Sequence, residues 1–133
     1  STRFEAWEMS ARLIARHPFG VGTGDVDDMI QKEYENQGTT LLPENRKGPH
    51  NQFIHMATGL GIPALILFLG FFFYSAFWGI RNGFLAFTGI LAIIFFCCVG
   101  ESTLERQAGV VAFTLLLPLA HALSINIIKD KMP

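Results

Sequence analysis

The hydrophobic and polar positions divide this chain into two parts of different character. Residues 1–59 mix apolar, polar and charged side chains, whereas residues 60–128 are almost entirely apolar. A helix needs about 20 apolar residues to cross the hydrocarbon core of a bilayer. We expect three membrane-spanning helices, joined by short turns that make neighbouring helices antiparallel, at 60–79, 84–100 and 108–128.

The polar part begins with helical patterns separated by a turn. Apolar residues recur at three- and four-residue steps over 1–16, which predicts an amphipathic helix. This helix should end before Pro18, because the residue that precedes a proline avoids the α region. A glycine-rich turn follows, and a second helix is predicted over 26–36, with Thr23 or Asp25 as its N-cap.

A loop and a third helix complete the polar part. Residues 37–48 are rich in glycine, proline and polar side chains, which predict an irregular loop. Pro49 suits the first turn of a helix, so we expect a helix that opens with His50 and Asn51 and runs on into the first membrane span. The predicted fold is an all-α integral membrane protein, with a helical segment outside the bilayer at 1–59 followed by the three spans.

The composition agrees with an integral membrane protein, and the positions of the charges predict which side of the membrane each part faces. The chain is 50% hydrophobic and only 16% charged, whereas soluble domains are about a quarter charged. Positive charges near spans favour the cytoplasmic side of the membrane. Arg81 and the lysines of a tail at 129–133 share one side, which we therefore expect to be cytoplasmic. Residues 1–59 then face the periplasm or the cell exterior, and Arg106 counts against this orientation.

Three further features limit the classes of protein to consider. No signal peptide precedes the polar part, so we expect the chain to be the C-terminal portion of a longer multi-pass protein. A net charge of −1 without a basic stripe argues against nucleic-acid binding. The adjacent Cys97 and Cys98 point in different directions on a helix, so we expect two unbridged, buried thiols that pack as small hydrophobic side chains.

Two candidate motifs in the polar part also have simpler structural explanations. Gly20, Gly22 and Gly24 could let backbone N–H groups approach a phosphate, but no strand precedes them, which favours an ordinary turn. Asp25 and Asp27 could bind a metal ion in an Asp-x-Asp pattern. They open a predicted helix, and complementing its N-terminal dipole is the interpretation that the pattern favours.

The histidines give one functional candidate. His50 and His55 are five residues apart rather than the four of a helical zinc pair, so we expect no metal site. His50 lies after a polar loop at the start of a membrane helix, and this position favours a functional role. His121 lies within the third span beside Pro118, which should kink that helix. We interpret His121 as a hydrogen-bonding residue at a helix contact rather than as a catalytic group.

Four motifs occur in a recognisable order along the chain. They are Arg3-x-x-x-Trp7, His17-Pro18-x-Gly20-x-Gly22-x-Gly24, His50-Asn51, and Gly59-Leu60-Gly61-Ile62-Pro63 at the start of a span. In this order and topology the chain resembles the O-antigen ligase and O-antigen polymerase superfamily. The match covers the external segment and the first span, and the last two spans agree in topology.

The resemblance implies a multi-pass protein of the bacterial inner (cytoplasmic) membrane with a GT-C-type fold. Residues 1–59 would be its large periplasmic loop. The implied activity is transfer of a glycan from undecaprenyl diphosphate to an acceptor hydroxyl, on lipid A core or another molecule, at the periplasmic face. The implied enzyme is an inverting glycosyltransferase of the ligase type that needs neither a metal ion, nor ATP, nor another cofactor. The family's other essential arginine lies in an earlier external loop, so this segment alone should be inactive.

By the same resemblance, Arg3 clamps the diphosphate and His50 is the catalytic base. The leaving diphosphate is anionic, and a guanidinium stabilises such charge with forked N–H donors. A histidine titrates near neutral pH and can take the proton of the acceptor hydroxyl. Asn51 would orient His50 or cap the helix, and Gly22 and Gly24 would support the diphosphate or a helix cap.

Alternatives of two kinds remain open. An O-antigen polymerase or a protein O-oligosaccharyltransferase would use the same scaffold and lipid donor with a different acceptor. A polysaccharide transporter or flippase would need polar residues around a cavity at the bilayer midplane, where the spans offer His121 and scattered Ser, Thr and Asn. A pure anchoring subunit would leave His50 and Asn51 without a role.

Overall fold

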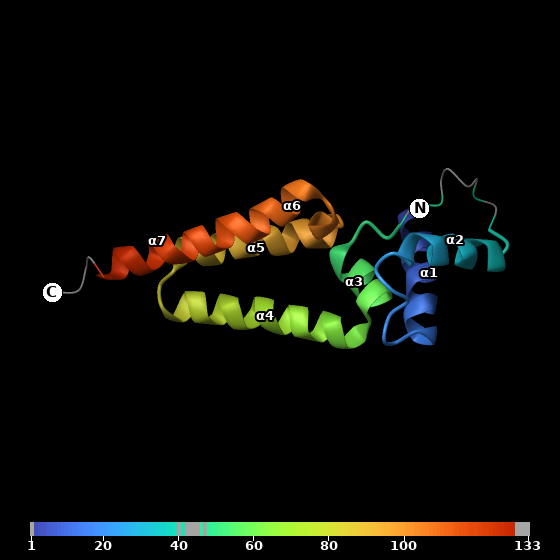
Figure 1. Cartoon of the computed structure of the whole chain (residues 1–133), viewed down its shortest axis with the longest axis horizontal. Helices are drawn as coiled ribbons and strands as arrows, with labels where there is room; N and C mark the ends of the chain where they lie inside the picture. The colour runs from blue at the N-terminus through green and yellow to red at the C-terminus, as the bar shows by residue number, and fades with distance from the viewer. Residues whose placement is uncertain (1, 40, 42–45, 47, 130–133) are drawn as a thin grey trace.

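The computed structural model describes residues 2–39, 41, 46 and 48–129, and this part of the chain consists of helices and irregular segments, without a strand. Its elements are α1 (Thr2–Arg16), α2 (Val26–Asn36), α3 (Gln52–Leu60), α4 (Ile62–Arg81), α5 (Leu85–Gly100), η2 (Thr103–Glu105), α6 (Gln107–Val111), η3 (Ala112–Leu116) and α7 (Leu117–Lys129). They form two groups that lie end to end, with α3 between them (Figure 1). Half of the predicted loop after α2 and most of the predicted tail, at 40, 42–45, 47 and 130–133, lie outside the described residues.

The helices α1 and α2 form a small unit with its own core, as their amphipathic patterns predict. Their apolar faces bury one cluster: Ala6, Met9, Leu13, Val26, Ile30 and Tyr34. Arg16, at the end of α1, donates two hydrogen bonds of 2.8 and 2.9 Å to the buried carboxylate of Glu33 on α2. Asp25 occupies the N-cap position of α2, although its side chain makes no capping hydrogen bond. The cluster and the bidentate ion pair together hold α2 against α1.

The third helix differs from the prediction at both ends. It begins at Gln52 rather than at Pro49, because Asn51 is extended and caps the helix, while His50 has a φ of 45°. It ends at Leu60, where Gly61 adopts a φ of 88° and turns the chain before α4 begins. The expectation of one helix running on into the membrane is therefore wrong, and α3 is a separate connecting helix.

The remaining helices form a long antiparallel group of apolar side chains (Figure 1). Helix α4, with 20 residues, and the run Gln107–Ile127, with 21, are long and apolar enough to cross a bilayer. Helix α5 is equally apolar but has 16 residues, which at about 1.5 Å per residue is shorter than the hydrocarbon core of roughly 30 Å. Most residues of the two long helices are not buried, so they are not core helices of a soluble domain.

Aromatic side chains fill the space between these helices. Phe72, Phe84 and Phe87 belong to its buried core. His121 packs among Trp78, Phe84 and Phe87, with ring centroids 5.1, 6.0 and 5.7 Å from its own. The structure thus gives His121 ring contacts at the predicted helix interface. Both cysteines are free, but only Cys98 is buried as expected, whereas Cys97 is exposed because it lies on another face of α5.

Pro118 changes the local geometry of the last helix. The π-helical turn η3 directly precedes α7, in which Pro118 is the second residue. A proline has no N–H to donate to the carbonyl four residues earlier, and wider π spacing is one way in which a helix accommodates this loss. The predicted irregularity is therefore a π turn within a run that stays helical from Gln107 to Lys129.

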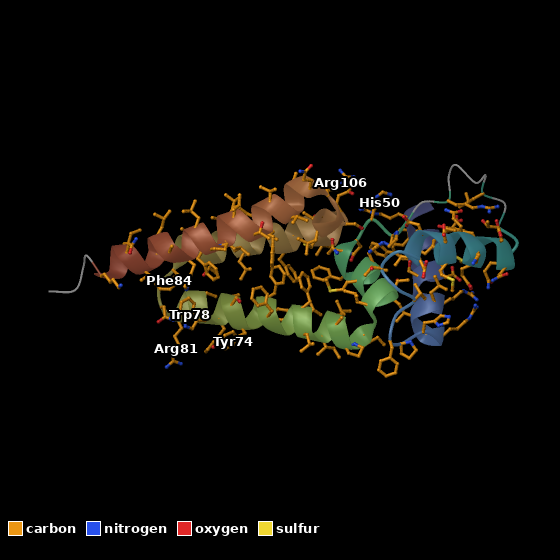
Figure 2. The ribbon with its side chains drawn as sticks, viewed as in Figure 1. His50, Tyr74, Trp78, Arg81, Phe84 and Arg106 are labelled. Carbon is orange, nitrogen blue, oxygen red and sulfur yellow. The ribbon has the colours of Figure 1, made fainter. Side chains whose placement is uncertain are left out.

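The charged ends of the apolar helices agree with a single orientation. Arg81, at the end of α4, and the C-terminal end of α7 lie at the same end of the helix group (Figures 1 and 2). The helices α1, α2 and α3 lie at the opposite end. This arrangement separates the polar part from Arg81 and from the C-terminal end of α7.

Candidate active site

Polar side chains gather where α3 meets the connector between α5 and α6. Asn51 accepts hydrogen bonds from the backbone N–H groups of Phe53 and Ile54, at 3.0 and 3.1 Å, and so caps α3. Its amide nitrogen donates to the carbonyl of Val99 at 2.9 Å, near the end of α5. The next residue, Gln52, accepts from the N–H of Leu104 at 2.7 Å. These bonds fix the start of α3 against the end of α5.

Helix α1 reaches the same place with two side chains. Trp7 donates from its indole nitrogen to the carbonyl of Pro49 at 2.8 Å. Arg3 donates from Nη2 to the carbonyl of His50, at 3.2 Å, and to the carbonyl of Gly100, the last residue of α5. The structure therefore brings Arg3 and His50 together, although 47 positions separate them in the sequence.

His50 faces two charged residues of the connector. Its Nδ1 lies 3.4 Å from Oε2 of Glu101, and Nη2 of Arg106 donates to the same oxygen at 3.4 Å. The backbone of His50 is in the left-handed region, with a φ of 45°, which costs an ordinary residue about 1–2 kcal/mol. Strain of this kind persists where the surroundings hold it, and it is frequent at functional positions. In Figure 2, His50 and Arg106 lie together at the junction of the two helix groups.

A pocket of about 250 Å³ lies beside His50. Its lining is polar apart from Gly48 and Pro49 and consists otherwise of Asp27, His50, His55, Glu101, Ser102 and Arg106. His55 is half-buried on α3, and burial lowers its pKa, with the Asp27 carboxylate opposing this shift. Among the described residues, no group of three or more His, Cys, Asp and Glu side chains could hold a metal ion.

The glycine-rich turn has a different position from His50. The N–H of Val21 donates to the carbonyl of Thr58 and that of Gly22 to the carbonyl of Gly59, both at 2.9 Å. Gly22 therefore uses its N–H in packing against α3, and neither it nor Gly24 lines the polar pocket. Gly24 is exposed, with open space around its Cα.

Of the predicted site residues, Arg3, His50 and Asn51 thus lie together. Glu101 and Arg106 were not among the predicted site residues, and Arg106 had entered only as a charge that bears on the orientation. One signal could have identified them: two antiparallel spans after residue 60 return the chain to the side on which 1–59 lies, which places this connector beside His50.

Replacing Asn51 with alanine should destabilise the junction between α3 and α5. The substitution removes the acceptor for two N–H groups and the donor to Val99, so we expect a loss of about 1–2 kcal/mol. The measurement is the thermal midpoint of the purified protein in detergent. Asn82→Ala is the matched control, because Asn82 makes one exposed hydrogen bond to Trp78 at the other end of the helices. Equal midpoints for the two variants would contradict the assigned role of Asn51.

The apolar helices and the polar unit at one end of them define a membrane protein. Comparison with known protein families identifies its family, because the model of the O-antigen ligase family matches residues 1–69. The chain belongs to this family, as the order of its motifs indicated. The matched residues include α1, the glycine-rich turn, α3 and the first part of α4. No match was found among curated proteins or among solved structures.

Proposed function

We propose that this chain carries the acceptor-activating part of an enzyme that transfers a glycan from undecaprenyl diphosphate to a hydroxyl group. The observation that carries the proposal is the contact between Arg3 and His50, with Glu101 against the imidazole, in a member of the O-antigen ligase family. An arginine can stabilise a departing diphosphate, and a histidine beside a carboxylate can take the proton of the acceptor hydroxyl. The proposed acceptor is a hydroxyl of lipid A core or of another glycan.

The proposed reaction uses each group in a distinct way. His50 takes the proton of the acceptor hydroxyl as its oxygen attacks the anomeric carbon. The bond from that carbon to the diphosphate oxygen breaks on the opposite face, which inverts the configuration, and the electron pair leaves with the diphosphate. Glu101, beside Nδ1, favours the tautomer in which Nδ1 carries the hydrogen and Nε2 accepts the proton.

Arg3 has donors left for the leaving group. Both of its hydrogen bonds within the described residues come from Nη2, and a guanidinium has five N–H donors in total. The permanent charge of arginine can stabilise a departing diphosphate without a metal ion, and this is the basis on which we propose metal-independent transfer. Arg106 lies close enough to His50 to add a second positive charge, since both contact Glu101.

The location of the reaction follows from the orientation of the helices. We propose three spans in the inner membrane, of which α5 is the second along the chain and the shortest. Residues 1–59 then lie in the periplasm and the end of α7 in the cytoplasm, as part of a GT-C-type fold. This topology places His50 at the outer surface of the bilayer, where a lipid-linked diphosphate has its headgroup. The position of Arg81 and the end of α7 far from His50 supports it (Figure 2).

Glycan analysis of a strain that lacks the gene tests the proposal. For a ligase we expect full-length glycan chains to accumulate on the lipid carrier and to be missing from lipid A core, with recovery when the gene is restored. Single unpolymerised repeats would instead indicate a polymerase, and the loss of glycoproteins a protein O-oligosaccharyltransferase. Retention of lipid-linked glycan on the cytoplasmic side would indicate a flippase. An unchanged glycan profile would overturn every one of these assignments.

A further inference from the structure

Asp27 and His55 line the polar pocket but have no role in the proposed reaction. Asp27 comes from α2 and His55 from the second turn of α3, so they reach the pocket from different elements. His50, Glu101 and Arg106 line the same space. A molecule in this pocket therefore lies next to the proposed base as well as next to Asp27 and His55.

We propose that Asp27 and His55 bind hydroxyl groups of the acceptor sugar and hold the attacking hydroxyl toward His50. This inference rests on the proposed function and names the occupant of the pocket within it. The lining is made of groups that pair with hydroxyls: two carboxylates, two imidazoles, one serine and one guanidinium. A carboxylate accepts hydrogen bonds from sugar hydroxyls, and an imidazole can both donate and accept.

The charges in the pocket favour a neutral sugar over the diphosphate. Among the described lining residues, Asp27 and Glu101 are formally negative and Arg106 is the one arginine or lysine, so the formal charge of these three is negative. An anionic diphosphate in this pocket would be repelled by the Asp27 carboxylate, which weakens its binding. Arg3 is absent from this lining, so the diphosphate is better placed near Arg3. We therefore assign the donor diphosphate to Arg3 and the acceptor sugar to the pocket, with His50 next to both.

The state of His55 suits this role. Burial lowers its pKa, although the Asp27 carboxylate opposes the shift. The neutral ring is therefore favoured, and a neutral imidazole offers one donor and one acceptor to a sugar. The pocket volume of about 250 Å³ is below the range of roughly 300–1,000 Å³ that is usual for drug-sized ligands. It is suited to one sugar ring rather than to a longer glycan.

Steady-state kinetics of the full-length protein in detergent test this assignment. Acceptor concentration is varied at saturating lipid-diphosphate donor, and then donor at saturating acceptor. For Asp27→Ala and for His55→Gln we expect the acceptor KM to rise about tenfold or more, the usual scale for losing a hydrogen bond to a charged or buried polar group. The donor KM and kcat should stay within about twofold of the unaltered protein.

The matched control is Asp28→Ala. Asp28 is the next residue of α2, carries the same charge, is exposed and does not line the pocket. It should leave the acceptor KM unchanged. Binding of a fluorescent acceptor glycan without donor gives a second readout, and it should weaken for Asp27→Ala in parallel with KM while the thermal midpoint stays the same.

Three results would overturn the assignment. They are an unchanged acceptor KM, a rise in the donor KM alone, and a fall in thermal midpoint with both KM values preserved, which would mean that Asp27 and His55 only join α2 to α3. Failure of the proposed function has a different signature, because the unaltered protein would then transfer no glycan and His50→Ala would change nothing.

Discussion

Replacing His50 with alanine should lower the rate of glycan transfer by about 10²–10⁴-fold, the usual contribution of a positioned general base. Without the imidazole, the acceptor hydroxyl must lose its proton to water while its oxygen attacks. The substitution should leave the fold in place, since Arg3 binds the carbonyl of His50 and not its ring. The measurement is initial transfer rate with purified full-length protein at saturating donor and acceptor.

His17→Ala is the control for this experiment. His17 is exposed after the end of α1 and does not line the polar pocket, so its removal should leave the rate unchanged. Arg3→Ala, measured alongside, should also reduce transfer, and Arg12→Ala on the same helix should not, because Arg12 pairs with Glu8 in an exposed contact. Transfer at the normal rate by both His50→Ala and Arg3→Ala, at equal protein levels, would refute the assignment of the site.

The second large effect is expected from Gly20→Ala. Gly20 has a φ of 89°, and a Cβ on it would lie 2.3 Å from the carbonyl oxygen of Gly59. That carbonyl accepts the N–H of Gly22, and the carbonyl of Pro18 accepts the N–H of Ile62 at 2.8 Å. An alanine must therefore push the turn away from the α3–α4 junction. We expect a loss of about 2–5 kcal/mol from the left-handed backbone and the overlap together.

Thermal unfolding and limited proteolysis of the purified protein measure this effect. Undocking the turn should lower the thermal midpoint and expose the segment between α1 and α2 to protease, and transfer should fall because α1 carries Arg3. Gly24→Ala is the matched control in the same turn. A Cβ on Gly24 meets nothing within 4 Å, so the control should keep its stability. If Gly20→Ala is as stable as Gly24→Ala, the turn does not dock as described.

Helix bounds in the polar part followed closely from local patterns. The stripe of apolar residues and the proline at 18 predicted α1, and the pattern over 26–36 predicted α2, because each helix buries one face of its own sequence. The start of α3 was misplaced at Pro49. A proline is compatible with a first helical turn, but here the Asn51 side chain satisfies the N–H groups of Phe53 and Ile54 and sets the start three residues later, at Gln52.

The candidate site was predictable only in part. The motif order identified Arg3, His50 and Asn51, and the structure brings these residues together. Glu101 and Arg106 follow a span and carry no recognisable motif, so their role depends on a contact that spacing does not reveal. Asp27 was explained by the dipole of α2, and the structure places it in the pocket as well. A local sequence pattern can explain one role of a side chain, such as complementing a helix dipole. It does not reveal which residues of another helix lie next to that side chain.

The sequence by itself determined the division of this protein into a polar helical unit and apolar helices, and its membership of the O-antigen ligase family. The spacing of apolar residues and the length of apolar runs are local properties of the sequence, so they predict which segments bury one face and which are apolar throughout. Only the tertiary structure decided which polar groups meet. The docking of the glycine-rich turn on α3 and the return of the chain through α4 and α5 bring Arg3, Asp27, His50, Glu101 and Arg106 to the junction of the two helix groups. Those contacts depend on helix lengths and on directional hydrogen bonds between distant segments, which a linear pattern does not contain.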